Sequence, residues 1–214
     1  MSVVTIDKRL VGEDFMGLPF LDKFQLNFGR VLKRMNDEQF FEFCRSNPEL
    51  RIEMNRKGEI IVMPPTFSET GGKNFNLVAE FAVWARKDGT GKGFDSSTGF
   101  ILPNGAIRSP DLSWIKLKKW NALSIQQRSK FAHVCPDFVV ELRSESDSLK
   151  KLQAKMNEYI ENGASLGWLI DAGAKRRVYI YRPQTEVKIL ENPETVSGET
   201  LLKGFTLNLK EIWD

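Results

Sequence analysis

The amino-acid sequence predicts a mixed α/β fold in which helices flank a β-sheet. The first observation is the almost uninterrupted apolar segment 137–143, which is typical of a strand buried on both faces. The second is an amphipathic helix expected directly after it, at 147–162, with apolar residues at helical spacing. The third is a pair of strands expected at 166–171 and 177–182. Strand–helix–strand order with apolar strands indicates a sheet covered by helices.

Two elements are expected at the start of the domain. Residues 36–47 predict a short helix with Asn36 as its N-cap and Gln39 at the capping-box position. Residues 50–63 predict a hairpin, because apolar and charged residues alternate before a turn at 55–58 and a second apolar strand follows it.

The middle and the end of the chain complete the predicted elements. After a helix at 68–88, the glycine-rich segment 89–94 is expected to be a connector. Strands are expected at 94–102 and 107–115, on either side of a Pro-Asn-Gly turn, and residues 185–214 offer short β-like pieces. The helix at 68–88 is expected from the apolar residues that repeat along it, Leu77, Val78, Phe81, Trp84 and Ala85.

Composition limits the chemistry that the chain can perform. The 41% hydrophobic and 28% charged residues are those of a globular protein and exclude disordered, collagen-like and membrane-spanning classes. Two cysteines, Cys44 and Cys135, are too few for a disulfide framework or a zinc site. The single histidine, His133, argues against a Ser-His-Asp hydrolase and against a multi-histidine metal centre. Chemistry is therefore expected from the 28 acidic side chains and the 31 lysines and arginines.

The domain prediction is one folded unit at 36–214, preceded by an N-terminal extension at 1–35 that shows no clear periodicity. The N-terminus alternates acids and bases and lacks the apolar stretch of a secretory signal. No apolar run approaches the roughly 18 residues that a membrane helix needs. We therefore expect a cytoplasmic protein without a membrane partner.

Two acidic residues on predicted strands are candidates for a metal site. Strand alternation points Asp111 away from Leu112 and Trp114. Glu141 lies in an otherwise apolar strand, where an unpaired carboxylate is costly. If the two strands are neighbours, they lie roughly 4.8 Å apart, and a divalent cation such as Mg²⁺ or Mn²⁺ would relieve the repulsion between the acids. The alternative is a structural ion pair between Asp111 and Arg143.

Lys155 is the candidate cation of this site. It lies in the helix expected at 147–162, beside the buried stripe and one turn before Tyr159. From there its ammonium can reach back toward the end of the preceding strand. In the alternative, the side chain runs along the helix and keeps its charged head in water.

A third acid is available on the helix expected at 68–88. Glu69 and Glu80 project from the same side of this helix, next to its apolar stripe. Either carboxylate can join a metal site beneath the helix. The alternative for Glu69 is a purely structural one, because a negative charge near a helix N-terminus is stabilised by the helix dipole.

The segment between Asp111 and Asp137 contains no acidic residue and is a candidate nucleic-acid-binding surface. Its cations are interleaved with Trp114 and Trp120, a combination that suits a phosphate backbone. The alternative is an ordinary solvated loop and helix. The candidate nucleic-acid-binding residues are Lys116, Lys118, Lys119, Arg128 and Lys130.

Three motifs together resemble the Uma family of restriction-type endonucleases, which is common in cyanobacteria and belongs to the PD-(D/E)XK nuclease superfamily. They are GG-x-N-x-x-L at 71–77, FDSSTGFILPNGAIRSPDLSWI at 94–115, and CPDFVVELRSESDSLKKLQAKMNEYIENGASLGWLID at 135–171. The resemblance covers about residues 36–214 and is specific over 93–171. It implies a restriction-endonuclease-like core, Mg²⁺ or Mn²⁺ as cofactor, and hydrolysis of DNA phosphodiester bonds.

Carried onto this chain, the resemblance assigns Asp111 and Glu141 as the two motif acids that bind the metal. The motif lysine would fall at position 143, where this chain has Arg143, which cannot serve as a base because it does not lose its proton. Lys155 is then the candidate for a lysine that has moved to the following helix. The extra metal-binding acid would be Glu69, with Glu80 as the second choice.

The departure at Arg143 leaves two other functions open. One is a catalytically silent nucleic-acid-binding or regulatory module on the same fold. The other is a protein-interaction domain in which Asp111 and Arg143 form a structural ion pair. Restriction-type nucleases commonly dimerise to cut both strands, so a homodimer is expected by analogy.

Overall fold

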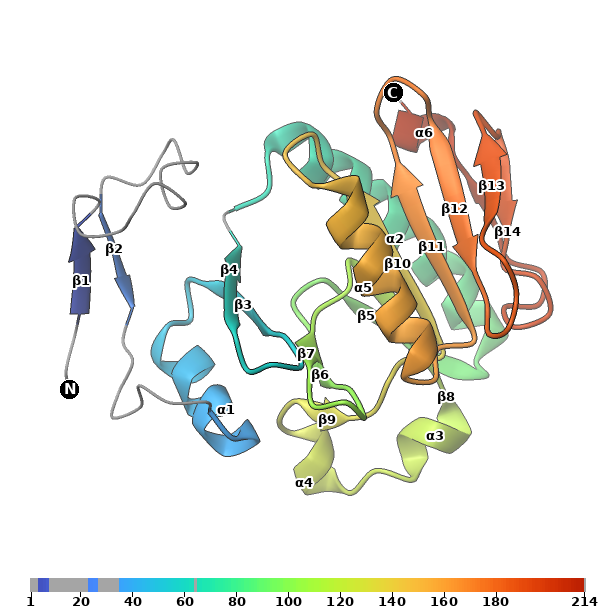
Figure 1. Ribbon diagram of the computed structural model, residues 1–214. Helices are drawn as coiled ribbons and strands as arrows, with labels where there is room; N and C mark the ends of the chain where they lie inside the picture. Colours follow the sequence, from blue (N-terminus) through green and yellow to red (C-terminus); the bar gives the residue numbers. More distant parts are fainter. Residues whose placement is uncertain (1–3, 8–22, 27–34, 64, 214) are drawn as a thin grey trace.

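The computed structural model describes residues 4–7, 23–26, 35–63 and 65–213. A mixed six-stranded sheet lies at its centre, with strands in the order β13-β12-β11-β10-β8-β5 (Figure 1). This is the mixed α/β class that the sequence predicts. The strands of this sheet are β5 Gly91–Asp95, β8 Leu112–Lys116, β10 Phe138–Arg143, β11 Leu166–Asp171, β12 Arg177–Tyr181 and β13 Lys188–Glu191.

The apolar segment that predicted a central strand forms β10. It pairs in parallel with β11 and antiparallel with β8, so both of its edges are hydrogen-bonded inside the sheet. The residues Phe138 to Leu142 are all buried. A strand covered on both faces needs apolar residues at successive positions, and Glu141 is the one acid within this run.

Helices cover both faces of the sheet, as Figure 1 shows with α5 in front and α2 behind. On the front face, Met156 and Tyr159 of α5 pack in one buried cluster with Val139. On the rear face, Phe81 of α2 joins the cluster that contains Phe138. Alternation along β10 therefore separates the two cores.

The rear layer also contains the two-stranded sheet of β14 and β15. The bounds of the elements that cover the central sheet are α2 Ser68–Asp88, α5 Leu149–Glu161, α6 Lys210–Trp213, β14 Thr195–Ser197 and β15 Thr206–Asn208.

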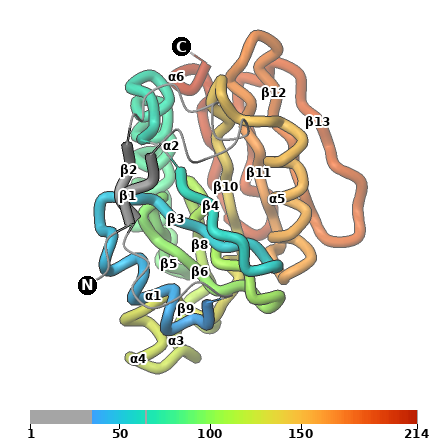
Figure 2. The backbone as a smooth tube through the Cα atoms, turned by 60° about the vertical axis from the view of Figure 1, so that its left-hand side comes forward, coloured from blue at the N-terminus to red at the C-terminus, as the bar shows by residue number. Residues whose placement is uncertain are grey.

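A second, five-stranded sheet has the order β4-β3-β7-β6-β9, and Figure 2 shows its hairpin β3–β4 beside α5. Helix α1 begins after Asn36, whose side chain and that of Gln39 form the predicted capping box. Phe40 and Phe43 of this helix pack against the sheet through Ile52 of β3. The bounds are α1 Asp37–Ser46, β3 Arg51–Met54, β4 Ile60–Met63, β6 Phe100–Ile101, β7 Ile107–Arg108 and β9 Ala132–His133.

The prediction that 89–94 is a connector is wrong, because most of this segment forms the edge strand β5. Gly91 sits so close to the indole of Trp114 that a Cβ atom there would lie 2.0 Å from the ring. A Cβ at Gly93 would meet Phe81 at 3.2 Å. The glycines therefore allow close packing against large aromatic rings, which a count of turn-forming residues does not reveal.

The strands expected at 94–102 and 107–115 are each divided between the two sheets. In the first, Asp95 ends β5 and accepts hydrogen bonds from the backbone and hydroxyl of Ser97, which turns the chain into β6. In the second, Pro110 lies between β7 and β8, and a proline cannot donate to a ladder. The division places Asp111 immediately before β8, at the junction of the two sheets.

Two short helices, α3 Leu117–Asn121 and α4 Ile125–Arg128, follow β8. Figures 1 and 2 place them, together with α1, at one end of the molecule. Of the predicted extension 1–35, strands β1 Val4–Asp7 and β2 Lys23–Leu26 are antiparallel partners, and most of the rest lies outside the described residues. Within the described ranges, no helix combines the length and apolarity needed to cross a membrane.

Candidate active site

Asp111 immediately precedes β8, and Glu141 lies on the neighbouring strand β10, on the same face of the central sheet. The register pairs Leu112 of β8 with Val140 of β10, so the next position brings the two acids opposite each other. The backbone N–H of Leu142 donates to Asp111 Oδ2 over 2.8 Å, which fixes this carboxylate against β10. Both acids face the side of the sheet that α5 covers.

Lys155 of α5 places its ammonium inside this acidic cluster. Its Nζ lies 2.8 Å from Glu141 Oε1 and 2.9 Å from Glu53 Oε1, and only 13% of the side chain is exposed. The hydroxyl of Tyr159, one helical turn further on, donates to the same Glu141 Oε1 over 2.9 Å. The lysine therefore reaches back over the sheet instead of extending into water.

Glu53 is the member of the cluster that sequence reasoning missed. Strand alternation along 50–54 places the apolar side chains of Ile52 and Met54 on one face of the strand and Glu53 on the other. A charged side chain on the second face is expected to be exposed to solvent. In the structure the second face of β3 is covered as well, and the Glu53 side chain is 3% exposed. An acid between two apolar strand residues was the available signal, the same one that drew attention to Glu141.

A second cation, Arg108, ties Glu53 to the neighbouring elements. Its Nη1 lies 3.0 Å from Glu53 Oε2, while its Nε donates to Glu158 Oε2 over 2.7 Å. Ser109 donates its backbone N–H to Glu53 Oε1 over 2.9 Å. Since Ser109 precedes Asp111 by two residues, Glu53 also anchors the segment that leads into the site.

The two motif acids hold their protons more tightly than usual. Burial raises the pKa of Glu141 to about 7; the negative charges of Asp111 and Glu53 add to this rise, and Lys155 opposes it. Burial also raises the pKa of Asp111, against the lowering effects of the Leu142 N–H and Lys155. Both groups therefore lack enough positive charge nearby to offset their desolvation.

The pKa of Glu53 is shifted in the opposite direction, to a lower value than usual. Burial alone favours its neutral form, but Lys155 and Arg108 outweigh this effect and lower its pKa. At Lys155 burial favours the neutral amine, yet Glu141 and Glu53 prevail and raise its pKa, so the ammonium stays charged. Burial and Glu141 raise the pKa of Tyr159, which keeps the phenol protonated as a donor.

The cluster carries an excess of negative charge. Its four carboxylates and two cations leave a formal charge of −2 when all are ionised, and Arg51, 3.9 Å from Asp111, offsets one of these charges. The remaining negative charge favours the binding of a cation. The hydrogen bonds of the motif acids fall on Asp111 Oδ2 and Glu141 Oε1. Among the described residues no group of three His, Cys, Asp or Glu side chains could hold a metal. The cluster consists of Glu53, Arg108, Asp111, Glu141, Lys155 and Glu158.

Arg143, at the position of the motif lysine, has other partners. Its Nη1 lies 3.0 and 2.9 Å from the two carboxylate oxygens of Asp171 on β11, and its Nε donates to the carbonyl of Asp147. The ion pair considered between Asp111 and Arg143 is therefore replaced by one with Asp171. The guanidinium that lies near Asp111 belongs to Arg51, with Nη2 3.9 Å from Oδ1.

The helix acids lie apart from these contacts. Glu69 is 75% exposed and pairs with Lys73 one turn along α2, at 2.9 Å. Glu80 accepts a hydrogen bond from the backbone N–H of Asn208, next to the β14–β15 hairpin. The described partners of the two helix acids, Lys73 and Asn208, are thus not residues of the acidic cluster.

The predicted nucleic-acid-binding residues occupy the end of the molecule formed by α3 and α4. Lys116 ends β8, roughly 16 Å along the strand from Asp111. Lys116 and Lys118 are exposed, and Arg128 lies over the Trp120 ring at 5.3 Å. The other two are engaged in salt bridges, Lys119 with Asp137 at 3.5 Å and Lys130 with Glu38 at 2.5 Å.

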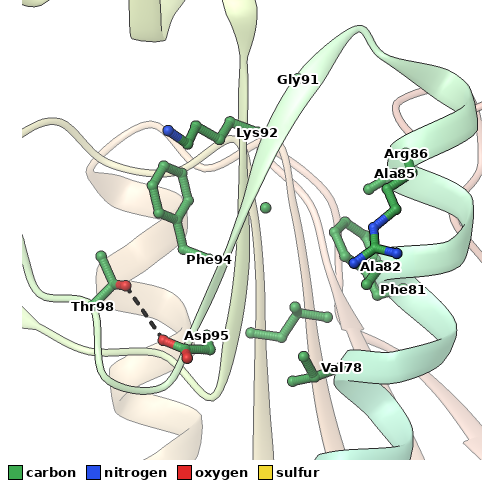
Figure 3. Close-up of a pocket in the computed structure, with 12 residues that line it drawn as sticks. Val78, Phe81, Ala82, Ala85, Arg86, Gly91, Lys92, Phe94, Asp95 and Thr98 are labelled. Atoms are coloured by element: carbon green, nitrogen blue, oxygen red, sulfur yellow. Dashed lines mark hydrogen bonds between the residues drawn. The ribbon is translucent and has the colours of Figure 1, made fainter.

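A hollow of about 500 Å³ lies elsewhere, between α2 and the edge strand β5 (Figure 3). Val78, Ala82 and Arg86 line it from the helix, and Gly93 lines it from the strand. It opens on the α2 side of the sheet, whereas the acidic cluster is on the α5 side. This hollow and the acidic cluster are thus at different places on the molecule.

Comparison with known proteins identifies relatives of this arrangement. A family model described as "Putative restriction endonuclease", Uma2, matches residues 37–210. A crystal structure described as a putative nuclease belonging to DUF820, from Anabaena variabilis ATCC 29413, has 21% sequence identity and a TM-score of 0.64. The match covers 77% of this chain and 90% of that chain, and it establishes the similarity of fold. No curated protein matches the chain.

The family match spans both sheets, the helices on either face and every residue of the acidic cluster. It confirms the resemblance that the motifs at 71–77, 94–115 and 135–171 indicate. The chain therefore belongs to the Uma2 family of restriction-endonuclease-like proteins.

Proposed function

We propose that this protein is a divalent-metal-dependent endonuclease of the PD-(D/E)XK type that hydrolyses DNA phosphodiester bonds. One observation carries the proposal. Asp111, directly before β8, and Glu141, on the adjacent strand β10, face the same side of the sheet, and the ammonium of Lys155 lies 2.8 Å from Glu141. This is the set of groups that metal-assisted phosphodiester hydrolysis requires.

The donor set fits Mg²⁺ or Mn²⁺. Carboxylate oxygens are the ligands that these hard cations prefer, and Mg²⁺ usually keeps several waters, so two carboxylates suffice. Asp111 Oδ1 and Glu141 Oε2 are the oxygens that would hold the ion, because their partner oxygens accept hydrogen bonds from Leu142 and Tyr159. When bound, the ion would bind a non-bridging phosphate oxygen and lower the pKa of a coordinated water.

The side chains around the acids then position the reaction. Lys155 is held between two carboxylates and stays protonated, so it orients the attacking water and stabilises developing negative charge instead of accepting a proton. The water oxygen forms a bond to phosphorus as the bond from phosphorus to the 3′ oxygen breaks. The attacking water releases a proton to the solvent and the departing 3′ oxygen takes one up from it, so the products are a 3′-hydroxyl and a 5′-phosphate. Arg51, beside Asp111, is placed to contact a neighbouring phosphate.

The DNA backbone would also contact the basic surface at α3 and α4. Two cations lie over the Trp120 ring, with Lys92 Nζ 5.0 Å and Arg128 Cζ 5.3 Å from its centroid. Lys116, at the end of β8, and Lys118, in α3, add two exposed ammonium groups. Stacking holds the charges in place without neutralising them, which leaves them available to phosphates.

The test of catalysis is a nicking assay on supercoiled plasmid with Mg²⁺ or Mn²⁺. Asp111→Ala and Glu141→Ala should each abolish cleavage, and Glu161→Ala, an exposed acid at the end of α5, should not. Cleavage that survives in both site variants would exclude this site. A chain that binds DNA but cuts none in either metal would instead be the catalytically silent module.

The test of the basic surface is binding, measured in EDTA by fluorescence anisotropy with a labelled duplex. Lys92→Ala and Arg128→Ala should weaken binding and reduce the slope of log affinity against log salt by about one each. Lys188→Ala, on the strand β13 at the opposite edge of the sheet, is the matched control. Unchanged affinity in the first two variants would exclude this surface.

A further inference from the structure

Glu53 occupies a place in the acidic cluster that the metal-site proposal does not explain. It comes from the second sheet, and its carboxylate is almost fully buried. Its three contacts reach α5 through Lys155, β7 through Arg108, and the connection between β7 and β8 through the Ser109 N–H. Through Lys155, which also contacts Glu141 on β10, Glu53 is linked to the central sheet.

The pattern of charges around Glu53 argues against a role as metal ligand. Oε1 receives two hydrogen bonds, from Lys155 and Ser109, and Oε2 faces the Arg108 guanidinium. Two cations in contact thus already compensate this carboxylate. In Asp111 and Glu141, by contrast, the described hydrogen bonds fall on one carboxylate oxygen only, Oδ2 and Oε1, and the other oxygen is available to an ion.

The contacts of Glu53 control the two groups that would act on the substrate. Without Glu53, Glu141 would be the one carboxylate of this cluster left in salt-bridge contact with Lys155, and the ammonium would shift toward the oxygens that a metal needs. The Ser109 N–H would also lose its anchor, two residues before Asp111. A displacement of about 1 Å in such a site is enough to lower a rate by about a hundredfold.

We propose that Glu53 is a positioning residue, which holds the Lys155 ammonium midway between two carboxylates and fixes the segment that carries Asp111. The proposal rests on the proposed nuclease function for its kinetic consequence. Its structural part, the restraint of Lys155, stands independently of whether DNA is cut.

The activity-independent test is NMR of the chain labelled with ¹⁵N at lysine Nζ. An ammonium that donates to two buried carboxylates is protected from exchange, so Lys155 should give a resolved signal in the wild type. Glu53→Gln should remove this signal. Glu158→Gln is the matched comparison: it removes a carboxylate from the same arginine, Arg108, but none from Lys155, and the signal should remain. A wild-type signal in Glu53→Gln would overturn the proposal.

The kinetic test separates positioning from folding. Per folded molecule, Glu53→Gln should lower kcat by about a hundredfold and change KM for DNA by less than about threefold. Glu59→Gln, an exposed acid on the same hairpin, should change neither. Should the Gln variant fail to fold, Glu53→Asp keeps the charge but is one methylene too short to span all three partners, and it should still lose the Lys155 signal.

Binding of Mn²⁺ alone, measured by titration calorimetry, decides between positioning and ligation. Glu53→Gln should weaken Mn²⁺ binding at least tenfold less than Glu141→Gln does. Equal losses in the two variants would make Glu53 a ligand and overturn the proposal. If the wild type cuts no DNA, the proposed function fails, and the NMR and Mn²⁺ results still decide the role of Glu53.

Discussion

Arg143 and Asp171 face each other across the parallel strands β10 and β11, and both carboxylate oxygens lie within 3.0 Å of the guanidinium Nη1. Arg143, to which the sequence resemblance assigns the motif lysine, is thereby paired with β11, and the lysine that contacts Glu141 comes from α5. The cation beside Glu141 is thus supplied by the helix that follows β10 and not by β10 itself.

Because Lys155 and not Arg143 contacts Glu141, substitutions at residues 143 and 155 should affect cleavage differently. Arg143→Lys should lower cleavage by less than about tenfold, because its pairing with Asp171 keeps it out of the contacts around Glu141. The same substitution should reduce stability slightly, by about 1 kcal/mol, since lysine cannot reproduce the paired geometry. Plasmid nicking and urea unfolding measure the two effects. Complete loss of cleavage in a folded Arg143→Lys protein would contradict this view.

Lys155→Met should lower cleavage at least a hundredfold and destabilise the fold. The substitution leaves the buried carboxylates of Glu53 and Glu141 facing each other without their shared cation, at a cost of about 3–5 kcal/mol. Mn²⁺ should restore part of the lost thermal stability, because a divalent ion supplies the missing positive charge. Lys151→Met, on the exposed side of α5, is the control and should leave both properties unchanged.

Glu69→Ala decides whether the helix acid belongs to the metal site. Since Glu69 is exposed and pairs with Lys73, we expect cleavage within about threefold of wild type and a stability change below about 0.5 kcal/mol. Cleavage assayed across a range of Mn²⁺ concentrations is the measurement. A large rise in the Mn²⁺ requirement would show that α2 closes onto the site and contributes a ligand.

Gly91→Ala should be strongly destabilising. The added Cβ would lie 2.0 Å from the Trp114 ring, so either β5 must leave the sheet edge or the buried indole must move. We expect a loss of about 3 kcal/mol or more in the free energy of unfolding, measured in urea. Gly72→Ala in α2 has open space around its Cβ and should instead gain about 0.5–1 kcal/mol.

Both thiols should be unreactive in the native protein at neutral pH. Burial raises the pKa of Cys44 to about 11 and that of Cys135 to about 12, so at pH 8 about one Cys44 in a thousand is a thiolate. Labelling with a disulfide reagent should be slow at pH 8 and rise about tenfold per pH unit up to 11. The unfolded chain should react at once. Rapid labelling of the folded protein at pH 7 would contradict the burial of these thiols.

The sequence alone determined the features that depend on neighbours along the chain. The capping box of Asn36 and Gln39 and the apolar run of β10 were predicted and are present, because hydrogen-bonding partners three residues apart and strand alternation are local properties. Alternation separated Asp111 and Glu141 from the apolar residues beside them, and the motifs indicated the family. Helical spacing placed Lys155 beside the buried stripe of α5 but left open whether its ammonium reaches the sheet or water.

Only the tertiary structure decided which side chains meet across long separations. Glu53 and Lys155 are 102 positions apart, and their contact depends on how the second sheet packs beside α5, which no local pattern specifies. The glycines of β5 were mistaken for a connector because the ring of Trp114 that requires them lies on another strand. Arg143 likewise pairs with Asp171 because β10 and β11 are parallel neighbours. Sequence periodicity determines which face of its own element a side chain is on, whereas tertiary packing determines which residues it contacts there.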